Sequence, residues 1–157
     1  MKIVLALGSN VGDRFNYLQT AIDHIKKSIL IDEIIIKQSS IIETKAILPS
    51  EAQSSWDIPY LNSLILGHTY INPQDLLVQI KKIEKNIGRK DRGYWGPREI
   101  DIDILCYGDM ELFENNLVIP HKELLKRDFW LNALKEIYPL WIHPSIKKPI
   151  LEINLEA

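Results

Sequence analysis

The sequence predicts a single α+β domain built on one antiparallel sheet, with helices on one face of the sheet and a C-terminal extension. Runs of apolar and β-branched residues alternate with two segments whose apolar residues recur at helical spacing. The elements follow the order strand, helix, strand, strand, helix, strand, which is the βαββαβ order of a ferredoxin-like fold. A length of 157 residues fits one domain, 1–157, with a substantial core.

The first βαβ unit is expected in the N-terminal part of the chain. Residues 2–7 form an apolar run that stops at Gly8, as in a buried strand. A helix is expected after Asp13, a suitable N-cap residue. Residues 31–42 are rich in β-branched side chains and are predicted to form the second strand. The apolar residues that recur at helical spacing in the helix after Asp13 are Leu18, Ala21, Ile22, Ile25 and Ile29.

The second unit begins after residues 43–58, which lack periodicity and are predicted to form a long loop. The third strand is expected at 60–70. Asn72 followed by Pro73 is a strong signal for a helix start, and Gly88 marks the end of that helix. We then expect a polar loop at 89–98, a strand at 99–107, a hairpin at 112–119 and one or two helices within 121–137.

Composition and charge exclude several classes of protein. The formal net charge is −2, which argues against a chain that coats nucleic acid or anionic lipid. One cysteine, Cys106, rules out an intramolecular disulfide and suits a reducing compartment. The longest apolar runs are shorter than the roughly 18 residues of a membrane helix. We expect a cytoplasmic monomer with small-molecule substrates and with neither nucleic acid nor membrane as a partner.

The predicted strand at 99–107 carries two carboxylates on one face. Because side chains alternate along a strand, Asp101 and Asp103 are expected to project side by side, roughly 6.6 Å apart. Ile100, Ile104 and Cys106 then face the core. Two carboxylates that close repel one another unless a cation lies between them, and oxygen ligands favour a hard ion such as Mg²⁺. The alternative is a strand with one solvated face and no bound ion.

The loop before this strand favours the interpretation as a metal site. Four cationic residues stand directly before the aspartates, and transfer of a polyphosphate needs both a metal and guanidinium groups. These four are Arg89, Lys90, Arg92 and Arg98. Gly93 and Gly96 indicate a loop able to move and close. Trp95 packs against either the core or a flat substrate. The turn at 8–13 lacks the Gly-Lys-Ser/Thr of a phosphate loop and is interpreted as structural.

Six short motifs in a fixed order make the chain similar to a known family. They are A-L-G-S-N-V-G-D at 6–13, P-Y-L-N at 59–62, G-R at 88–89, W-G-P-R-E-I-D-I-D-I-L at 95–105, I-P-H at 119–121 and R-D-F at 127–129. With these motifs the sequence resembles the 6-hydroxymethyl-7,8-dihydropterin pyrophosphokinases of folate biosynthesis, over nearly its whole length.

The resemblance implies a reaction and its site. ATP would give its β,γ-pyrophosphoryl unit to the pterin hydroxymethyl oxygen and release AMP. Asp101 and Asp103 match the ligands of two Mg²⁺ ions, and Arg89 and Arg92 lie in the matching catalytic loop. The positions that match ATP contacts are Lys81, Glu84, Arg98, Ile104, His121 and Arg127. Those that match pterin contacts are Thr44, Tyr60, Asn62, Trp95 and Phe129.

Some positions depart from the family pattern. Where a Pro-Pro-x-Gly stretch often follows the threonine, this chain has Lys45-Ala46-Ile47-Leu48. The catalytic loop is one residue shorter than in some relatives. Because relatives are sometimes fused to neighbouring folate enzymes, the chain could also act as part of such an assembly. An RNA-binding module or a nucleotide-binding regulator without turnover are the competing interpretations; the net charge and the lack of an aromatic RNP-type motif argue against the first.

Overall fold

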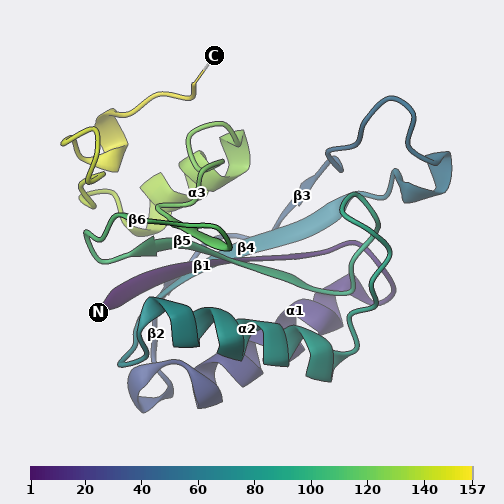
Figure 1. The fold of residues 1–157 in the computed structure, drawn as a ribbon, viewed down its shortest axis with the longest axis horizontal. Coiled ribbons are helices and arrows are strands. Elements are labelled where there is room, and N and C mark those ends of the chain that lie inside the picture. Colours follow the sequence, from purple (N-terminus) through teal and green to yellow (C-terminus); the bar gives the residue numbers. More distant parts are fainter. Residues whose placement is uncertain (157) are drawn as a thin grey trace.

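The computed structural model describes residues 1–156 as a sheet covered on both faces (Figure 1). The five strands are β1 (Lys2–Ser9), β2 (Ile35–Gln38), β3 (Ile42–Thr44), β4 (Tyr60–His68) and β5 (Asp101–Tyr107). Their order is β2-β4-β1-β5, with β3 also paired to β4, and every pairing is antiparallel. The predicted ferredoxin-like sheet is confirmed. The final residue of the predicted domain, 157, lies outside the described part.

Helices α1 (Arg14–Ser28) and α2 (Pro73–Ile87) begin where the sequence predicts. The Asp13 carboxylate accepts a hydrogen bond from Asn16 N, and the Asn72 side chain accepts one from Asp75 N, so each fills an N-cap role. Gly88 ends α2 in a left-handed conformation (φ 110°), which a glycine adopts without the penalty of a Cβ.

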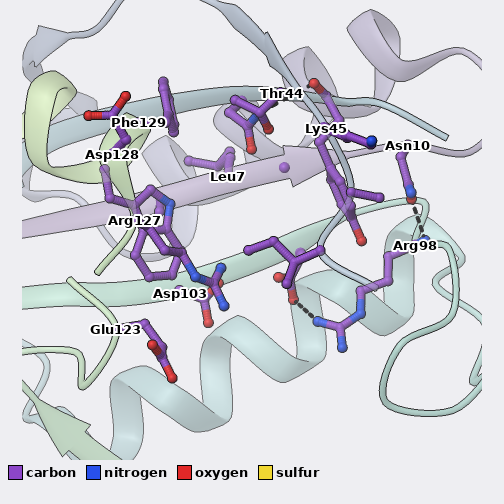
Figure 2. A pocket seen from close by; sticks show the side chains of 18 of the residues that line it. Leu7, Asn10, Thr44, Lys45, Arg98, Asp103, Glu123, Arg127, Asp128 and Phe129 are labelled. Carbon is purple, nitrogen blue, oxygen red and sulfur yellow. Dashed lines mark hydrogen bonds and ion pairs between the residues drawn. The ribbon is translucent and has the colours of Figure 1, made fainter. Parts of the chain in front are cut away.

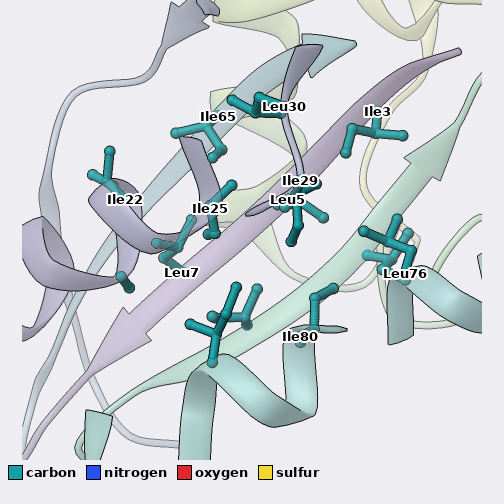
Figure 3. Packing of buried hydrophobic residues seen from close by; sticks show 14 of the residues in the cluster. Ile3, Leu5, Leu7, Ile22, Ile25, Ile29, Leu30, Ile65, Leu76 and Ile80 are labelled. Carbon is teal, nitrogen blue, oxygen red and sulfur yellow. The ribbon is translucent and has the colours of Figure 1, made fainter. Parts of the chain in front are cut away.

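Each face of the sheet has its own apolar core. Leu5 and Leu7 of β1 point toward α1 and α2, where they meet Ile25, Leu76 and Ile80 (Figure 3). The neighbouring residues of β1 point the other way and pack under α3 (Asp128–Ile137) and the C-terminal segment. That second core contains Val4, Ala6, Leu64, Leu66, Leu105, Trp130, Leu131, Leu134, Trp141 and Ile150. The helices of the βαββαβ unit therefore share one face, and the C-terminal extension covers the other.

The prediction of one continuous strand at 31–42 is wrong. This segment opens with a 3₁₀ turn, Ile31–Glu33, in which Asp32 has a positive φ of 56°. The strand proper is then broken at Ser39. Its Oγ accepts a hydrogen bond from Leu64 N at 2.8 Å, in a place where a strand would offer a main-chain carbonyl. Pairing with β4 resumes only at β3.

Several predicted boundaries shift. The loop predicted at 43–58 contains the end of β3 and a 3₁₀ turn, Ser54–Trp56. Strand β4 ends at His68 rather than 70, and β5 begins at Asp101 rather than 99. The predicted hairpin is confirmed as β6 (Leu112–Glu114) and β7 (Leu117–Ile119), and a single helix, α3, follows. Within residues 1–156, no helix has both the length and the apolar character needed to cross a bilayer.

A bulge in β5 changes the face of one predicted core residue. Ile104 lies opposite Leu5, but Cys106 lies opposite Val4, so Leu105 is an extra residue between them. Leu105 and Cys106 consequently both belong to the core under α3. The expectation that Cys106 packs beside the isoleucines is therefore wrong. The thiol is free and buried, and burial raises its pKa well above the ordinary value, which makes it a poor nucleophile.

Core packing between the sheet and α1–α2 gives a direct stability prediction. Leu5→Ala removes a fully buried side chain and should lower the free energy of unfolding by about 2–5 kcal/mol. Leu140→Ala, at a position 76% exposed, is the matched control and should change it by less than about 0.5 kcal/mol. Urea unfolding followed by circular dichroism measures both, and equal effects would contradict the assignment of this core.

Candidate active site

A pocket of about 790 Å³ opens on the α3 side of the sheet (Figure 2). Its floor is formed by β1 and β5, and its walls by the start of α3, the segment after β3 and the loop between α2 and β5. Ten of the residues singled out in the sequence line this pocket. They are Thr44, Tyr60, Asn62, Trp95, Arg98, Asp101, Asp103, His121, Arg127 and Phe129.

The two aspartates lie on the floor as the strand alternation predicts. Across the β1–β5 pairing, Asp101 is opposite Gly8 and Asp103 is opposite Ala6, two small residues that leave room above the sheet. Gly8 also leaves space for two side chains of β4, since a Cβ there would be 3.2 Å from a Tyr60 ring carbon and 3.3 Å from Asn62 Oδ1. The floor is therefore open because its β1 residues are small.

The carboxylates are surrounded by cationic groups. Asp101 Oδ1 accepts hydrogen bonds from Arg98 at 2.8 Å and Arg89 at 3.2 Å. Burial and the nearby Asp103 charge nevertheless raise the pKa of Asp101. Burial is the largest influence on the pKa of Asp103 and acts to raise it, but His121, whose Nε2 lies 3.6 Å from Asp103 Oδ1, together with Asp101 and Arg127 holds that pKa below its ordinary value. The carboxylates of Asp101 and Asp103 therefore repel one another, and a bound cation would reduce this repulsion.

The donor set at the floor fits Mg²⁺. Within residues 1–156 no group of three or more His, Cys, Asp or Glu side chains is arranged to hold a metal ion. Two carboxylates in an open pocket are what Mg²⁺ uses when water and substrate phosphates complete its shell. The residues present therefore suit an ion that arrives together with a phosphate substrate.

Three predicted nucleotide residues lie outside the pocket lining, around the outer edge of β5. Glu84 of α2 is buried and accepts hydrogen bonds from Arg89 Nη1 at 2.7 Å and from Ile102 N at 2.9 Å. Lys81 Nζ is 3.4 Å from the same carboxylate. The Ile104 side chain is buried in the core under α1 and α2. Glu84 therefore fixes Arg89 between itself and Asp101.

Arg92, expected beside the reacting phosphates, faces Glu99 instead. Its Nη1 and Nη2 atoms donate to the two oxygens of Glu99 at 2.8 and 2.7 Å, a bidentate pair. This hydrogen bonding, above all, lowers the pKa of Glu99 to about 2. Neither residue is found among the described residues that line the pocket.

The end of the pocket next to β3 and β4 combines aromatic rings with an amide group. Asn62 Nδ2 donates to Thr44 Oγ1 at 2.7 Å and to the Ile42 carbonyl at 3.1 Å. Trp95 is 43% exposed and meets Tyr94 edge to face, with ring centroids 4.8 Å apart. Of the two alternatives for Trp95, the structure therefore favours the surface of the pocket over the core.

The N-terminal side of α3 supplies a further positive wall. The Arg127 guanidinium lies 4.2 Å from the centre of the Trp130 ring, and the His121 ring meets the same indole edge to face at 4.7 Å. His121 Nδ1 accepts a hydrogen bond from Glu123 N, which fixes the ring and leaves Nε2 facing Asp103. His121 therefore makes a local hydrogen bond at the start of this segment and also lies at the pocket floor beside Asp103.

The chain matches a family of known activity. Residues 4–139 match the model of the family described as 7,8-dihydro-6-hydroxymethylpterin-pyrophosphokinase (HPPK). The chain belongs to this family. It is an ATP-dependent pyrophosphokinase of folate synthesis, which transfers pyrophosphate from ATP to 6-hydroxymethyl-7,8-dihydropterin.

Curated relatives agree with this membership. The chain is 44% identical over 154 residues to the 2-amino-4-hydroxy-6-hydroxymethyldihydropteridine pyrophosphokinase of Aquifex aeolicus, covering 98% of this chain and 91% of that protein. It is 39% identical over 139 residues to a folate synthesis bifunctional protein of Chlamydia muridarum, covering 87% of this chain but 30% of that protein. Pyrophosphokinases of this family therefore occur both alone and within longer folate enzymes.

Solved structures show the same HPPK fold. A Plasmodium falciparum HPPK-DHPS structure with pterin and p-hydroxybenzoate superposes with a TM-score of 0.71 at 18% identity, covering 96% of this chain and 42% of that one. A second, of the wild-type protein, gives a TM-score of 0.67 at 17% identity and covers 96% and 43%. At these identities the likeness concerns the fold.

Sequence reasoning missed one residue that joins two walls of the HPPK pocket. Asn10, in the turn interpreted as structural, is buried; its Oδ1 accepts from Arg98 N at 2.7 Å, and its Nδ2 donates to the Ile58 carbonyl at 3.0 Å. The signal available was an amide residue directly after a buried strand. Other lining residues without a prior assignment include Lys45, Tyr94, Lys122, Glu123, Lys126 and Asp128.

The Glu99 carboxylate predicts a pH dependence of stability. Its pKa falls from 4.5 to about 2 on folding, so its contribution is present above pH 4.5 and is lost as the pH falls toward 2. In Glu99→Gln the decrease in unfolding free energy over this interval should be smaller than in the unmodified chain. Urea unfolding at several pH values measures it, and identical slopes in the two proteins would contradict the assignment.

Proposed function

We propose that Asp101 and Asp103 hold two Mg²⁺ ions and that ATP and the dihydropterin meet above them. The observation that carries this proposal is the position of the aspartates on the floor of one pocket, with Arg98 and Arg127 and the aromatic rings of Tyr60 and Phe129 in its lining. Bound Mg²⁺ would neutralise charge on the phosphate oxygens and orient them. The presence of Mg²⁺ and the number of two ions are both part of what we propose.

The reaction requires charge stabilisation more than it requires a covalent partner from the protein. The hydroxymethyl oxygen attacks the β-phosphorus of ATP and gives up its proton to solvent, the bond from that phosphorus to the α,β-bridging oxygen breaks, and AMP leaves. Arg89 and Arg98 place two guanidinium groups beside Asp101, and Arg127 and His121 approach from the segment that precedes α3. We assign these groups to the phosphate chain, where fixed positive charge stabilises the transition state.

The nucleoside part of ATP extends, in this proposal, over the outer edge of β5. Ile102 N points outward to Glu84, and main-chain groups two residues apart in a strand point the same way, so the Ile104 main chain faces this edge too. Because the Ile104 side chain is buried, its contact with ATP would come from the main chain. Lys81 and Glu84 form the neighbouring surface of α2.

The pterin ring is assigned to the other end of the pocket. Tyr60 and Phe129 provide two aromatic faces, and a flat heterocycle gains free energy from stacking. Asn62 and Thr44 offer hydrogen-bonding groups to its edge, and Trp95 is the third aromatic side chain. Lys45 stands where relatives often have proline, so this chain adds a cation to that wall.

We further propose that the chain works as a monomer in the cytoplasm. Within relatives the domain is joined to other folate enzymes, as in the Chlamydia muridarum protein. Light scattering that gave the mass of one chain would support the monomer, and a dimer mass would contradict it.

Release of AMP tests the activity. With ATP and Mg²⁺, the chain should form AMP only when 6-hydroxymethyl-7,8-dihydropterin is added, and removal of Mg²⁺ with EDTA should stop it. ATP binding without AMP formation would instead identify a regulator that has lost turnover.

The aspartate assignment predicts a loss of the chemical step. Asp101→Asn and Asp103→Asn keep the side-chain shape, remove a charge and should each lower kcat by about 100- to 1,000-fold in saturating Mg²⁺. Circular dichroism and thermal unfolding should stay close to those of the unmodified chain. Full kcat in either variant would refute the metal assignment.

The aromatic pair predicts a change confined to one substrate. Phe129→Ala removes one stacking face and should raise KM for the pterin by about tenfold or more, while KM for ATP changes less. Phe15→Ala, on the exposed first turn of α1, is the matched control. Steady-state kinetics with each substrate varied separately measures the difference; an equal rise in both KM values would contradict the assignment.

A further inference from the structure

The loop between α2 and β5 is closed by a carboxylate outside the pocket. Glu99 stands two residues before β5 and is buried, with 4% of its surface exposed. In the described chain it accepts hydrogen bonds from Lys90 N at 3.1 Å and from the two Nη atoms of Arg92 at 2.8 and 2.7 Å. One side chain at the end of the loop thus binds its beginning and its middle.

The loop is also folded tightly around Arg92. Arg92 Nη1 donates a further hydrogen bond to the Pro97 carbonyl at 3.1 Å. The backbone of Gly96 lies so close that an added Cβ would be 2.6 Å from both the Cβ and the main-chain oxygen of Arg92. A residue larger than glycine would push the two sides of the loop apart, so the closed form depends on this contact.

We propose that Arg92 and Glu99 form a clasp that positions the loop, and that Arg92 acts through Glu99 instead of touching the phosphates. This inference rests on the proposed function. To reach a phosphate in the pocket, Arg92 would have to leave a buried carboxylate without its charged partner, which is strongly unfavourable. Arg92 is therefore a positioning residue, whereas Arg89 and Arg98, whose guanidinium groups already reach Asp101 on the pocket floor, are the arginines of this loop that we assign to ATP.

The clasp fixes the spacing of those two arginines. Lys90 and Glu99, joined by a hydrogen bond, are the immediate neighbours of Arg89 and Arg98 in the chain. The guanidinium groups of Arg89 and Arg98 converge on one oxygen of Asp101, at 3.2 and 2.8 Å. Opening the clasp would therefore loosen the spacing of the two arginines, which would then depend on Glu84 for Arg89 and on Asn10 for Arg98.

A double-mutant cycle on the full chain tests the clasp. Glu99→Gln and Arg92→Gln should each lower kcat by about tenfold or more, and the double variant should lie within about twofold of the worse single one, because both remove the same interaction. KM for ATP and for the pterin should change less than kcat. Hydrogen exchange of the peptide 89–98 should become faster in all three variants. Glu114→Gln, which removes an exposed carboxylate bonded to Gln74, is the matched control.

The competing role gives a different pattern. If Arg92 touched the phosphates directly, Glu99→Gln would keep or raise kcat while Arg92→Gln lowered it, and that result would overturn the clasp. If Glu99→Gln does not fold, Arg92→Lys tests the clasp instead, because it keeps the charge and loses the bidentate geometry. A reduced kcat together with faster hydrogen exchange would support the clasp. An unchanged kcat would overturn it. An inactive unmodified chain would refute the proposed function, whereas the exchange data would still report on the clasp.

Discussion

The pairing of β1 with β5 is the constraint on which the site depends. It sets Asp101 opposite Gly8 and Asp103 opposite Ala6, so two carboxylates stand over a floor without large side chains. Two negative charges at adjacent positions of one strand face are costly in a partly buried place. The surrounding elements relieve that cost with cationic groups while leaving space above the carboxylates for a substrate that brings its own charge.

Buried acids in a second layer hold the arginines that face the pocket. Glu84 accepts a hydrogen bond from Arg89, and Glu99 closes the loop that carries Arg98. Asn10 ties Arg98 to the segment before β4, so the wall proposed for ATP and the wall proposed for the pterin share one buried amide. Because these groups are buried and hydrogen-bonded, the arginines are held in place before a substrate arrives, which is the condition for effective electrostatic stabilisation.

The sequence predicted what depends on short-range rules. Asp13, Asn72 and Gly88 gave the helix ends because capping is local, and alternation along β5 brought Asp101 and Asp103 together. It failed where a distant partner decides. The bulge that turns Cys106 toward α3 is set by pairing with β1. The break at Ser39 is set by β4. The pairing of Arg92 with a buried acid seven residues along the chain was not predicted, because the loop between them has no periodicity.

The central claim is that the aspartate pair becomes a metal site only when a polyphosphate is present. Binding of Mn²⁺ as a spectroscopic substitute for Mg²⁺, counted by electron paramagnetic resonance with an uncleavable ATP analogue, measures this directly. The account predicts two tightly bound ions per chain with the analogue, weak binding without it, and loss of at least one ion when Asp101 or Asp103 is replaced by Asn. Equal binding in the unmodified and substituted chains would contradict it.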